Sequence, residues 1–452
     1  MYKSEDTFDL VKSLSQTEKR YFRIFSGTSG DTKNYLQVFD VLDRQDIYDS
    51  KSLTDKFAEG TINVSYEKNY LQKQILKSLR ACYSENSSAI ELQDILKNIE
   101  ILYRKRLTRQ CQKLVDKGVE TARQYEQWSY HLELIEWQYR IYGRSGNYKK
   151  LMLYAEEGLA EKIKLTDNIL AYSRVQQEIF VIVAMVQTKG VYSAQGIQKE
   201  FKKKITEAEK KLKTHTTGFR ITELLYSTLY LATHYSGNIK QSYKYARENY
   251  QHYNNHPHFK TDLPFKYFVA TGNLITRCIY LKKFAEGLQY IDDVKTFTGK
   301  LSYFARQDIS QEQDSILFEY KIRILLRENR FAEALQAAKE FEKKYNPKNL
   351  RKGIILTDRG KLARIYFANG LLRKSLQCVN EIINSDQEGF KLDYLIYSHL
   401  LRMCIHYNLN KYDVLGYLAE TASRTLQKLK LNDDFANDFI ELMKQVSKKH
   451  EP

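Results

Sequence analysis

The chain has 452 residues, more than one compact core usually needs, so its length predicts several domains or one elongated array of repeats. A hydrophobic content of 42% without a low-complexity linker excludes a disordered chain, and 4 prolines with 19 glycines favour long helices joined by short turns over a sheet protein. The net charge of +17 indicates either a polyanionic partner or a lysine-rich solvated surface.

The expected compartment follows from the cysteines and from the apolar runs. The cysteines are odd in number and widely spaced, which favours buried free thiols in a reducing environment; they are Cys82, Cys111, Cys278, Cys378 and Cys404. The chain opens without the charged and apolar run of a signal peptide. Its longest apolar run, Ile179–Val186, is shorter than the about 20 residues that span a bilayer. We expect a cytoplasmic protein that does not insert into membranes.

Residues 1–88 are predicted to form an N-terminal helical subdomain. Ser15 and Glu18 form a capping box at the start of one helix, and further helices are predicted over 34–42, 53–57 and 65–83. A cap for the rest of the chain is one interpretation. The alternative is a helix-turn-helix that reads DNA, in which the last helix presents Tyr66, Lys68, Asn69, Gln72 and Lys73.

Residues 89–430 repeat a helical hairpin. The second helix of each hairpin is predicted to open near Leu107, Tyr148, Tyr192, Ile239, Phe284, Phe331, Leu372 and Tyr412, so successive openings are 40 to 47 residues apart. Several openings follow a Gly or Asn, at Gly146, Gly237, Asn329, Gly370 and Asn410. These residue types adopt the left-handed conformation that ends a helix, so a tight turn is predicted at each.

The clearest copy of the hairpin lies at 317–341. Phe331, Ala334, Leu335, Ala338 and Phe341 fall on one face of a helix, and the two alanines allow a neighbouring helix to approach closely. Only an adjacent hairpin can cover the flank that remains, which is the logic of a repeat array.

These hairpins resemble tetratricopeptide repeats. The positions that carry the resemblance are Leu362, Ala363, Tyr366, Gly370, Leu372 and Ser375, together with Phe331, Ala334 and Pro347. The tetratricopeptide unit has about 34 residues, so the longer period here departs from the family. The opening Leu14–Phe22 also resembles uncharacterised bacterial helical-repeat proteins. The resemblance implies an all-α, right-handed superhelical array of about eight antiparallel hairpins.

The last segment, 431–452, is predicted to be a capping helix. Asn432, Asp433 and Asp434 can cap its start. One face is apolar, with Phe435, Phe439, Ile440, Met443 and Val446. An amphipathic helix of this kind suits the end of a solenoid.

Most of the positive charge lies in the middle of the chain. Residues 101–300 carry 33 basic and 19 acidic side chains. The two densest runs are the candidate partner-binding residues: Arg104, Lys105, Arg106, Arg109 and Lys113 in one, and Lys202, Lys203, Lys204, Lys210, Lys211 and Lys213 in the other. Basic side chains interleaved with aromatics bind nucleic acid, but a tyrosine in a helical repeat is also a routine packing residue.

The sequence carries no recognised catalytic motif, and no cofactor is expected. His252, His256 and His258 have a spacing that would suit a metal site, but Pro257 interrupts the helix and the interpretation as a polar helix end is preferred.

Two functions remain open. The first is a non-catalytic scaffold or adaptor that binds a protein or peptide. The second is a nucleic-acid or ribonucleoprotein binder that uses the basic middle of the chain. The sequence leaves the oligomeric state open.

Overall fold

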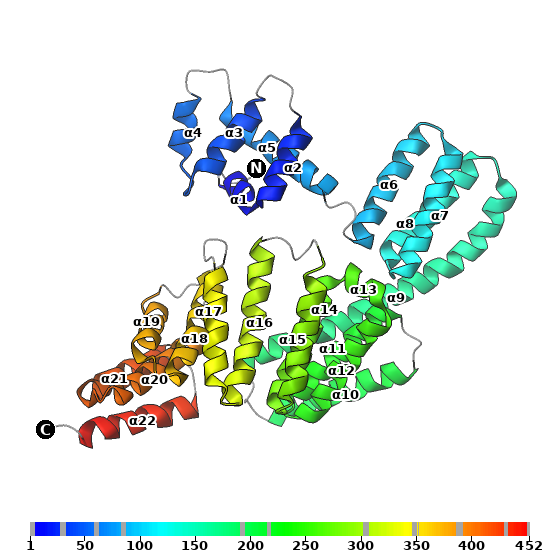
Figure 1. The fold of residues 1–452 in the computed structure, drawn as a ribbon. Helices are drawn as coiled ribbons and strands as arrows, with labels where there is room; N and C mark the ends of the chain where they lie inside the picture. The colour runs from blue at the N-terminus through cyan, green and yellow to red at the C-terminus, as the bar shows by residue number, and fades with distance from the viewer. Residues whose placement is uncertain are drawn as a thin grey trace. The chain divides into compact units, whose positions relative to one another are not determined.

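The computed structural model describes residues 5–27, 33–57, 63–82, 87–189, 195–214, 218–301, 307–345, 350, 352–385, 392–428 and 433–449 (Figure 1). Within these ranges every element is helical, which confirms the all-α prediction. The chain divides into two compact units. Unit 1 is 1–174 with 218–220 and 261–263, and unit 2 is 175–217, 221–260 and 264–452. No helix in the described ranges has the length and the apolar character that a bilayer crossing requires.

Unit 1 begins with a bundle of short helices. They are α1 (Asp6–Ser13), α2 (Gln16–Ser26), α3 (Asn34–Arg44), α4 (Ser50–Lys56) and α5 (Val64–Cys82). Phe22 and Phe39 lie at its centre with ring centroids 5.1 Å apart. The predicted capping box is present: the Glu18 amide donates to the Ser15 hydroxyl at 3.2 Å, and the Ser15 amide donates to the Glu18 carboxylate at 2.6 Å. Helix α1 was not predicted from the sequence.

The face proposed to read DNA is partly used inside this bundle. On α5, the Gln72 side chain is buried, and Lys68 donates a hydrogen bond to the Tyr48 hydroxyl at 3.0 Å. Tyr66 and Lys73 are exposed. The prediction that Gln72 faces a DNA groove is therefore wrong, because its side chain is buried in the bundle. DNA reading by the other residues stays a prediction.

The hairpin region of unit 1 follows. Its helices are α6 (Ser88–Arg104), α7 (Thr108–Gln124), α8 (Trp128–Arg144) and the first part of α9 (Tyr148–Lys189). Helix α7 packs against both α6 and α8. Gly118 permits close packing on α7, since a Cβ atom there would lie 2.9 Å from the Leu134 side chain.

Unit 2 contains the rest of α9 and the later hairpins. The helices are α10 (Gln195–Thr214), α11 (Phe219–Tyr235), α12 (Ile239–Asn255), α13 (Pro257–Asp262), α14 (Pro264–Tyr280), α15 (Phe284–Thr298), α16 (Gln307–Arg327), α17 (Phe331–Lys344), α18 (Lys352–Ala368), α19 (Leu372–Ile383), α20 (Leu392–Asn408), α21 (Leu415–Lys428) and α22 (Asp434–Lys449). From α14 to α22 each helix packs against the next along the chain (Figure 1). This sequential packing is that of a helical-repeat array.

The turns occur where the Gly and Asn residues predict them. Gly146, Gly237, Asn329, Gly370 and Asn410 all have positive φ, between 57° and 83°. At Asn329 the next amide, of Arg330, donates to the carbonyl of Leu325 at 2.9 Å, which is the closing bond of a Schellman motif. The predicted openings at residues 148, 239, 284, 331 and 372 are the first residues of their helices. Tyr192 lies outside the described residues, and α10 begins at Gln195.

The α16–α17 hairpin confirms the pattern of small residues. Ala334 and Ala338 are fully buried, and Leu335 and Phe341 pack against the same core. Phe331 is an exception, because its ring is 37% exposed at the start of α17. Pro347 lies outside the described residues.

Helix α9 departs from the hairpin rhythm. A repeating hairpin predicts a turn within 148–189, but these residues form one helix of 42 residues. The segment contains no proline. Its one glycine, Gly158, is buried against the Tyr139 side chain, so it serves close packing and not a turn.

The last helix agrees with its prediction except at one aromatic residue. Asp433 accepts a hydrogen bond from the Ala436 amide at 3.0 Å at the start of α22, and Ile440 and Met443 are buried. Phe435 is 63% exposed, because Ala436 occupies the buried position of the first turn. Leu431 and Asn432 lie outside the described residues. The division of the chain at 88 and 430 and the right-handed superhelix stay predictions.

Candidate functional site

Unit 2 contains a groove over α16, between α15 and α17, with a cavity of about 350 Å³. We call it the α15–α17 groove. Its apolar floor consists of Ile291, Leu317, Phe318, Ala337 and Phe341. Pockets of this volume lined by apolar side chains hold small ligands or single side chains of a partner.

The floor is hollow because a stacked pair of large rings lies beside a small residue. Phe318 of α16 and Phe341 of α17 stack with ring centroids 4.3 Å apart and planes 3° from parallel. Ala337 lies one turn before Phe341 and has only a methyl group to fill the space. The rings fix the two helices, and the alanine leaves the cavity open.

The rim of the groove is charged. Three lysines and three carboxylates line it: Lys295, Lys321, Lys344, Asp292, Asp314 and Glu340. Within the described residues the ammonium groups of these lysines make no hydrogen bond and no ion pair closer than 4 Å. Desolvation by burial raises the pKa of the Asp314 carboxyl, against the opposing effect of the positive Lys295 and Lys344. The lysines are therefore available to a carboxylate of a ligand.

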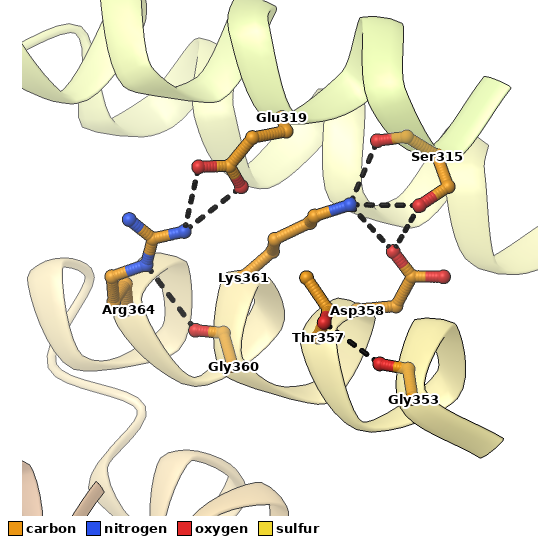
Figure 2. Close-up of polar contacts among 8 residues, drawn as sticks. All are labelled: Ser315, Glu319, Gly353, Thr357, Asp358, Gly360, Lys361 and Arg364. Carbon is orange, nitrogen blue, oxygen red and sulfur yellow. Dashed lines mark hydrogen bonds and ion pairs between the residues drawn. The ribbon is translucent and has the colours of Figure 1, made fainter. Parts of the chain in front are cut away.

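Another side chain of the groove, Tyr345, leads to a buried polar cluster between α16 and α18. Burial, together with the negative charge of Asp358, raises the pKa of the Tyr345 hydroxyl. In the cluster the Lys361 ammonium donates to the backbone oxygen of Ser315 at 2.8 Å, to its hydroxyl at 2.8 Å and to Asp358 at 2.7 Å (Figure 2). The Ser315 hydroxyl in turn donates to Asp358 at 2.6 Å.

This cluster combines a lysine, a serine and a carboxylate, groups that also occur in hydrolytic sites. Here the Lys361 and Asp358 side chains are only 3% and 1% exposed, so no substrate reaches the Ser315 hydroxyl. One turn further along, Arg364 pairs with Glu319 at 3.0 Å across the same two helices (Figure 2). The cluster therefore joins two neighbouring hairpins beside the groove and is structural.

Sequence reasoning missed both the groove and the cluster. A signal was present: Asp358 and Lys361 are three residues apart on a helix whose neighbours Leu356, Leu362 and Ile365 are buried. Opposite charges at that spacing in an apolar segment indicate a buried ion pair.

The first predicted basic run lies at the turn between α6 and α7 in unit 1. All five of its members are exposed: Arg104, Lys105, Arg106, Arg109 and Lys113. Arg104 forms an ion pair with Glu100. Arg144 of α8 lies at the same turn, since its guanidinium donates to the Tyr103 carbonyl at 2.8 Å and lies 4.3 Å from the Tyr103 ring centroid. The structure thus adds a sixth basic residue to this run.

The second predicted run lies on α10 in unit 2. Its members are Lys202, Lys203, Lys204, Lys210, Lys211 and Lys213. Lys204 is partly buried and lies 4.0 Å from Glu200, and Lys211 forms a 3.1 Å ion pair with Glu178 of α9. These contacts reduce the charge that the run presents to a partner. The two runs belong to different units.

The histidine cluster has the geometry of a helix end. Helix α12 ends at Asn255 and Pro257 begins α13. The His256 Nδ1 atom lies 2.9 Å from the His252 carbonyl oxygen, so that nitrogen is already in a hydrogen bond. Among the residues that the structure describes, no group of three His, Cys, Asp or Glu side chains has the arrangement of a metal site.

Several tyrosines of α11, α12 and α14 are packing residues. Tyr253 and Tyr267 are among the largest fully buried side chains, with ring centroids 5.5 Å apart. Burial raises the pKa of the Tyr230 hydroxyl to about 12. Such rings are part of the core and not free to stack on bases.

Comparison with known proteins does not assign this chain to a family. No protein-family model matches the chain, and no curated protein matches it. Among solved structures, the crystal structure of the P58(IPK) TPR domain aligns with 80% of this chain and 99% of that one, at 10% sequence identity and a TM-score of 0.26. The description of the present chain as an all-α helical-repeat protein rests on its own helices and turns.

Proposed function

We propose that this chain is a non-catalytic scaffold that binds a protein partner, and that the α15–α17 groove receives an apolar side chain of that partner. The observation that carries the proposal is the groove itself. It combines an apolar floor, a cavity of about 350 Å³ and a charged rim on a helical-repeat array. Repeat arrays expose extended surfaces suited to binding peptides.

The chemistry of the groove defines the partner segment. The cavity has room for one bulky aliphatic or aromatic side chain above the Phe318–Phe341 stack. Because Lys295, Lys321 and Lys344 have no carboxylate within ion-pair distance among the described residues, we expect acidic residues on either side of that anchor. The three rim carboxylates nearly balance the lysines, so the apolar anchor supplies most of the affinity.

A displayed library of short peptides tests the proposal. The library is selected on the wild-type chain, and binding is then measured to Ala337→Trp, which fills the groove. Ala332→Trp is the matched control, because Ala332 is exposed on α17 and does not line the cavity. We expect the selected peptides to bind the control like the wild type and to bind Ala337→Trp at least about tenfold more weakly. Equal binding to both folded variants would refute the role of the groove.

A second candidate function is nucleic-acid binding, and the exposed basic turn at α6–α7 is the observation that favours it. The test replaces Lys202, Lys203, Lys204, Lys210, Lys211 and Lys213 by Gln, and in a second variant Lys105, Arg106, Arg109 and Lys113. If either run binds a polyanion, its loss weakens binding to RNA or DNA and flattens the salt dependence. A wild type that binds neither nucleic acid at low salt, where charge attraction is greatest, would end this alternative.

A further inference from the structure

Helix α9 carries an exposed apolar stripe along its part in unit 1. The stripe consists of Tyr148, Met152, Leu159, Ile163 and Leu170, each 46% to 73% exposed. The opposite face of the helix already packs on α8, where the Tyr154 ring lies 5.2 Å from Tyr139 and 5.6 Å from Tyr142. The helix is thus apolar on two sides. Within the described residues one side packs on α8 and the other is exposed. Contiguous exposed apolar surface of this kind marks an interaction site.

The spacing of the stripe is that of a helix-pairing seam. Tyr148, Leu159 and Leu170 are eleven residues apart, and so are Met152 and Ile163. An eleven-residue repeat has about 3.67 residues per turn, close to the 3.6 of a straight helix, so the stripe stays on one side of α9. From Tyr148 to Leu170 it is about 33 Å long. A long straight helix is the shape that covers it.

The stripes of two copies are complementary when the two helices lie antiparallel. Tyr148 and Leu170 are equally distant from Leu159, as are Met152 and Thr166, and Ala155 and Ile163. In an antiparallel pair centred on Leu159, Met152 of one copy therefore lies opposite Thr166 of the other, and Ile163 lies opposite Ala155. Each of these contacts places a large side chain against a small one. Two-fold symmetry makes each such contact occur twice.

Charges beside the stripe match in the same arrangement. Lys149 and Asp167 are exposed, and neither forms an ion pair within the described residues. They lie almost equally far from Leu159 on its two sides, so Lys149 of one copy comes opposite Asp167 of the other at both ends of the pair. Opposite charges at these positions favour this orientation over a parallel one.

We propose that α9 is the interface of a homodimer, in which the stripes of two copies of this chain pair antiparallel about Leu159. The stripe belongs to unit 1 and the groove to unit 2, and they share no residue, so the dimer is tested separately from the proposed function.

Sedimentation velocity on the full chain, from about 1 to about 100 µM, tests the proposal. We expect a monomer–dimer equilibrium whose dissociation constant rises at least about tenfold in Leu159→Asp. Leu153→Asp is the matched control, because Leu153 is equally exposed on α9 but lies about 100° around the helix from Met152. Lys149→Glu should weaken the dimer, and adding Asp167→Lys should restore it. A wild type that stays monomeric, or a dimer that Leu159→Asp and Leu153→Asp weaken equally, overturns the proposal.

Cysteine cross-linking tests the antiparallel geometry. In a Cys82→Ser, Cys404→Ser background, Leu159→Cys should form a disulfide-linked dimer on mild oxidation, since residue 159 lies opposite its own copy. Ala155→Cys and Ile163→Cys should cross-link with each other when mixed, and each more slowly alone. A parallel pair would reverse that order, and an unrelated interface would give no cross-link at any of the three positions.

Discussion

Helix α16 packs against α17 and α18 through two interfaces of opposite chemistry, which we call the apolar joint and the polar joint. Within its hairpin it meets α17 through Ala334 and Ala338, both fully buried in an apolar core. Towards the next hairpin it meets α18 through Ser315, Asp358 and Lys361, a buried ion pair with a bridging hydroxyl. The apolar joint depends on volume, so related side chains can replace one another there. The polar joint depends on each partner being present, because an unpaired buried charge is strongly unfavourable.

The largest loss of stability is expected when one partner of the polar joint is removed. Lys361→Met leaves the Asp358 carboxylate and the Ser315 hydroxyl buried without the ammonium, and should lower the free energy of unfolding by about 3–5 kcal/mol. Urea unfolding followed by circular dichroism measures it. Replacing all three groups, in Ser315→Ala, Asp358→Leu, Lys361→Met, should recover most of the loss. If the single and triple variants are equally unstable, the joint depends on shape and not on charge.

The apolar joint should be disrupted by a substitution that adds side-chain volume. Ala334→Trp places an indole where two helices meet at a methyl group, and overpacking should cost about 1–3 kcal/mol or more. Lys339→Ala, on the exposed side of the same helix, should change stability by less than about 0.5 kcal/mol. Thermal melts of the two variants check this. Two equally harmless substitutions would mean that the packed face of α17 has been misassigned.

A buried histidine without an ion pair among the described residues, His399, can be compared with the polar joint. Burial, with the neighbouring positive Arg402, lowers the pKa of His399 to about 4, and its side chain is buried on α20. The folded chain therefore keeps His399 neutral while the unfolded chain protonates it below about pH 6.5. The stability it supports is present above pH 6.5 and is lost as the pH falls towards 4, by about 1–3 kcal/mol. His399→Gln should reduce the loss between pH 7 and 4.5 in urea unfolding; an unchanged pH profile would contradict it.

The smallest effect is expected at the turns. Lys282 has a φ of 58°, a left-handed conformation that glycine adopts without strain. Lys282→Gly should stabilise the chain by up to about 1 kcal/mol, whereas Gly370→Ala, at a φ of 70°, should destabilise it by a similar amount. The midpoint of urea unfolding reports both. Shifts of the same sign in the two variants would show that these turns are not strained in the way described.

The sequence predicts local features better than contacts between distant residues. The left-handed turns at Gly237 and Asn329 and the buried face of Ala334 follow from residue type and helical spacing. The joint between Ser315 and Lys361 does not, because these residues are 46 apart and meet only after two hairpins pack. The groove depends on how far α15 and α17 lie apart above Ala337, a distance that no local pattern encodes. The continuous α9 could have been suspected only from the absence of proline in 148–189, since Gly158 and Asn168 are of the residue types that end helices elsewhere in the chain.

The uniform turns bear on how this chain tolerates changes in length. Each turn of the Asn329 type closes in two residues with a fixed hydrogen bond, as Leu371 to Tyr366 at 2.8 Å and Lys411 to His406 at 3.0 Å also show. An inserted residue there would rotate the following helix by about 100° and move its buried face towards water. The spacing of the openings nevertheless varies from 40 to 47 residues. Part of this variation lies in the helices themselves, since α12, α15, α17 and α19 have 17, 15, 14 and 12 residues. The helix ends away from these turns are therefore where a difference in length or a foreign loop does least harm.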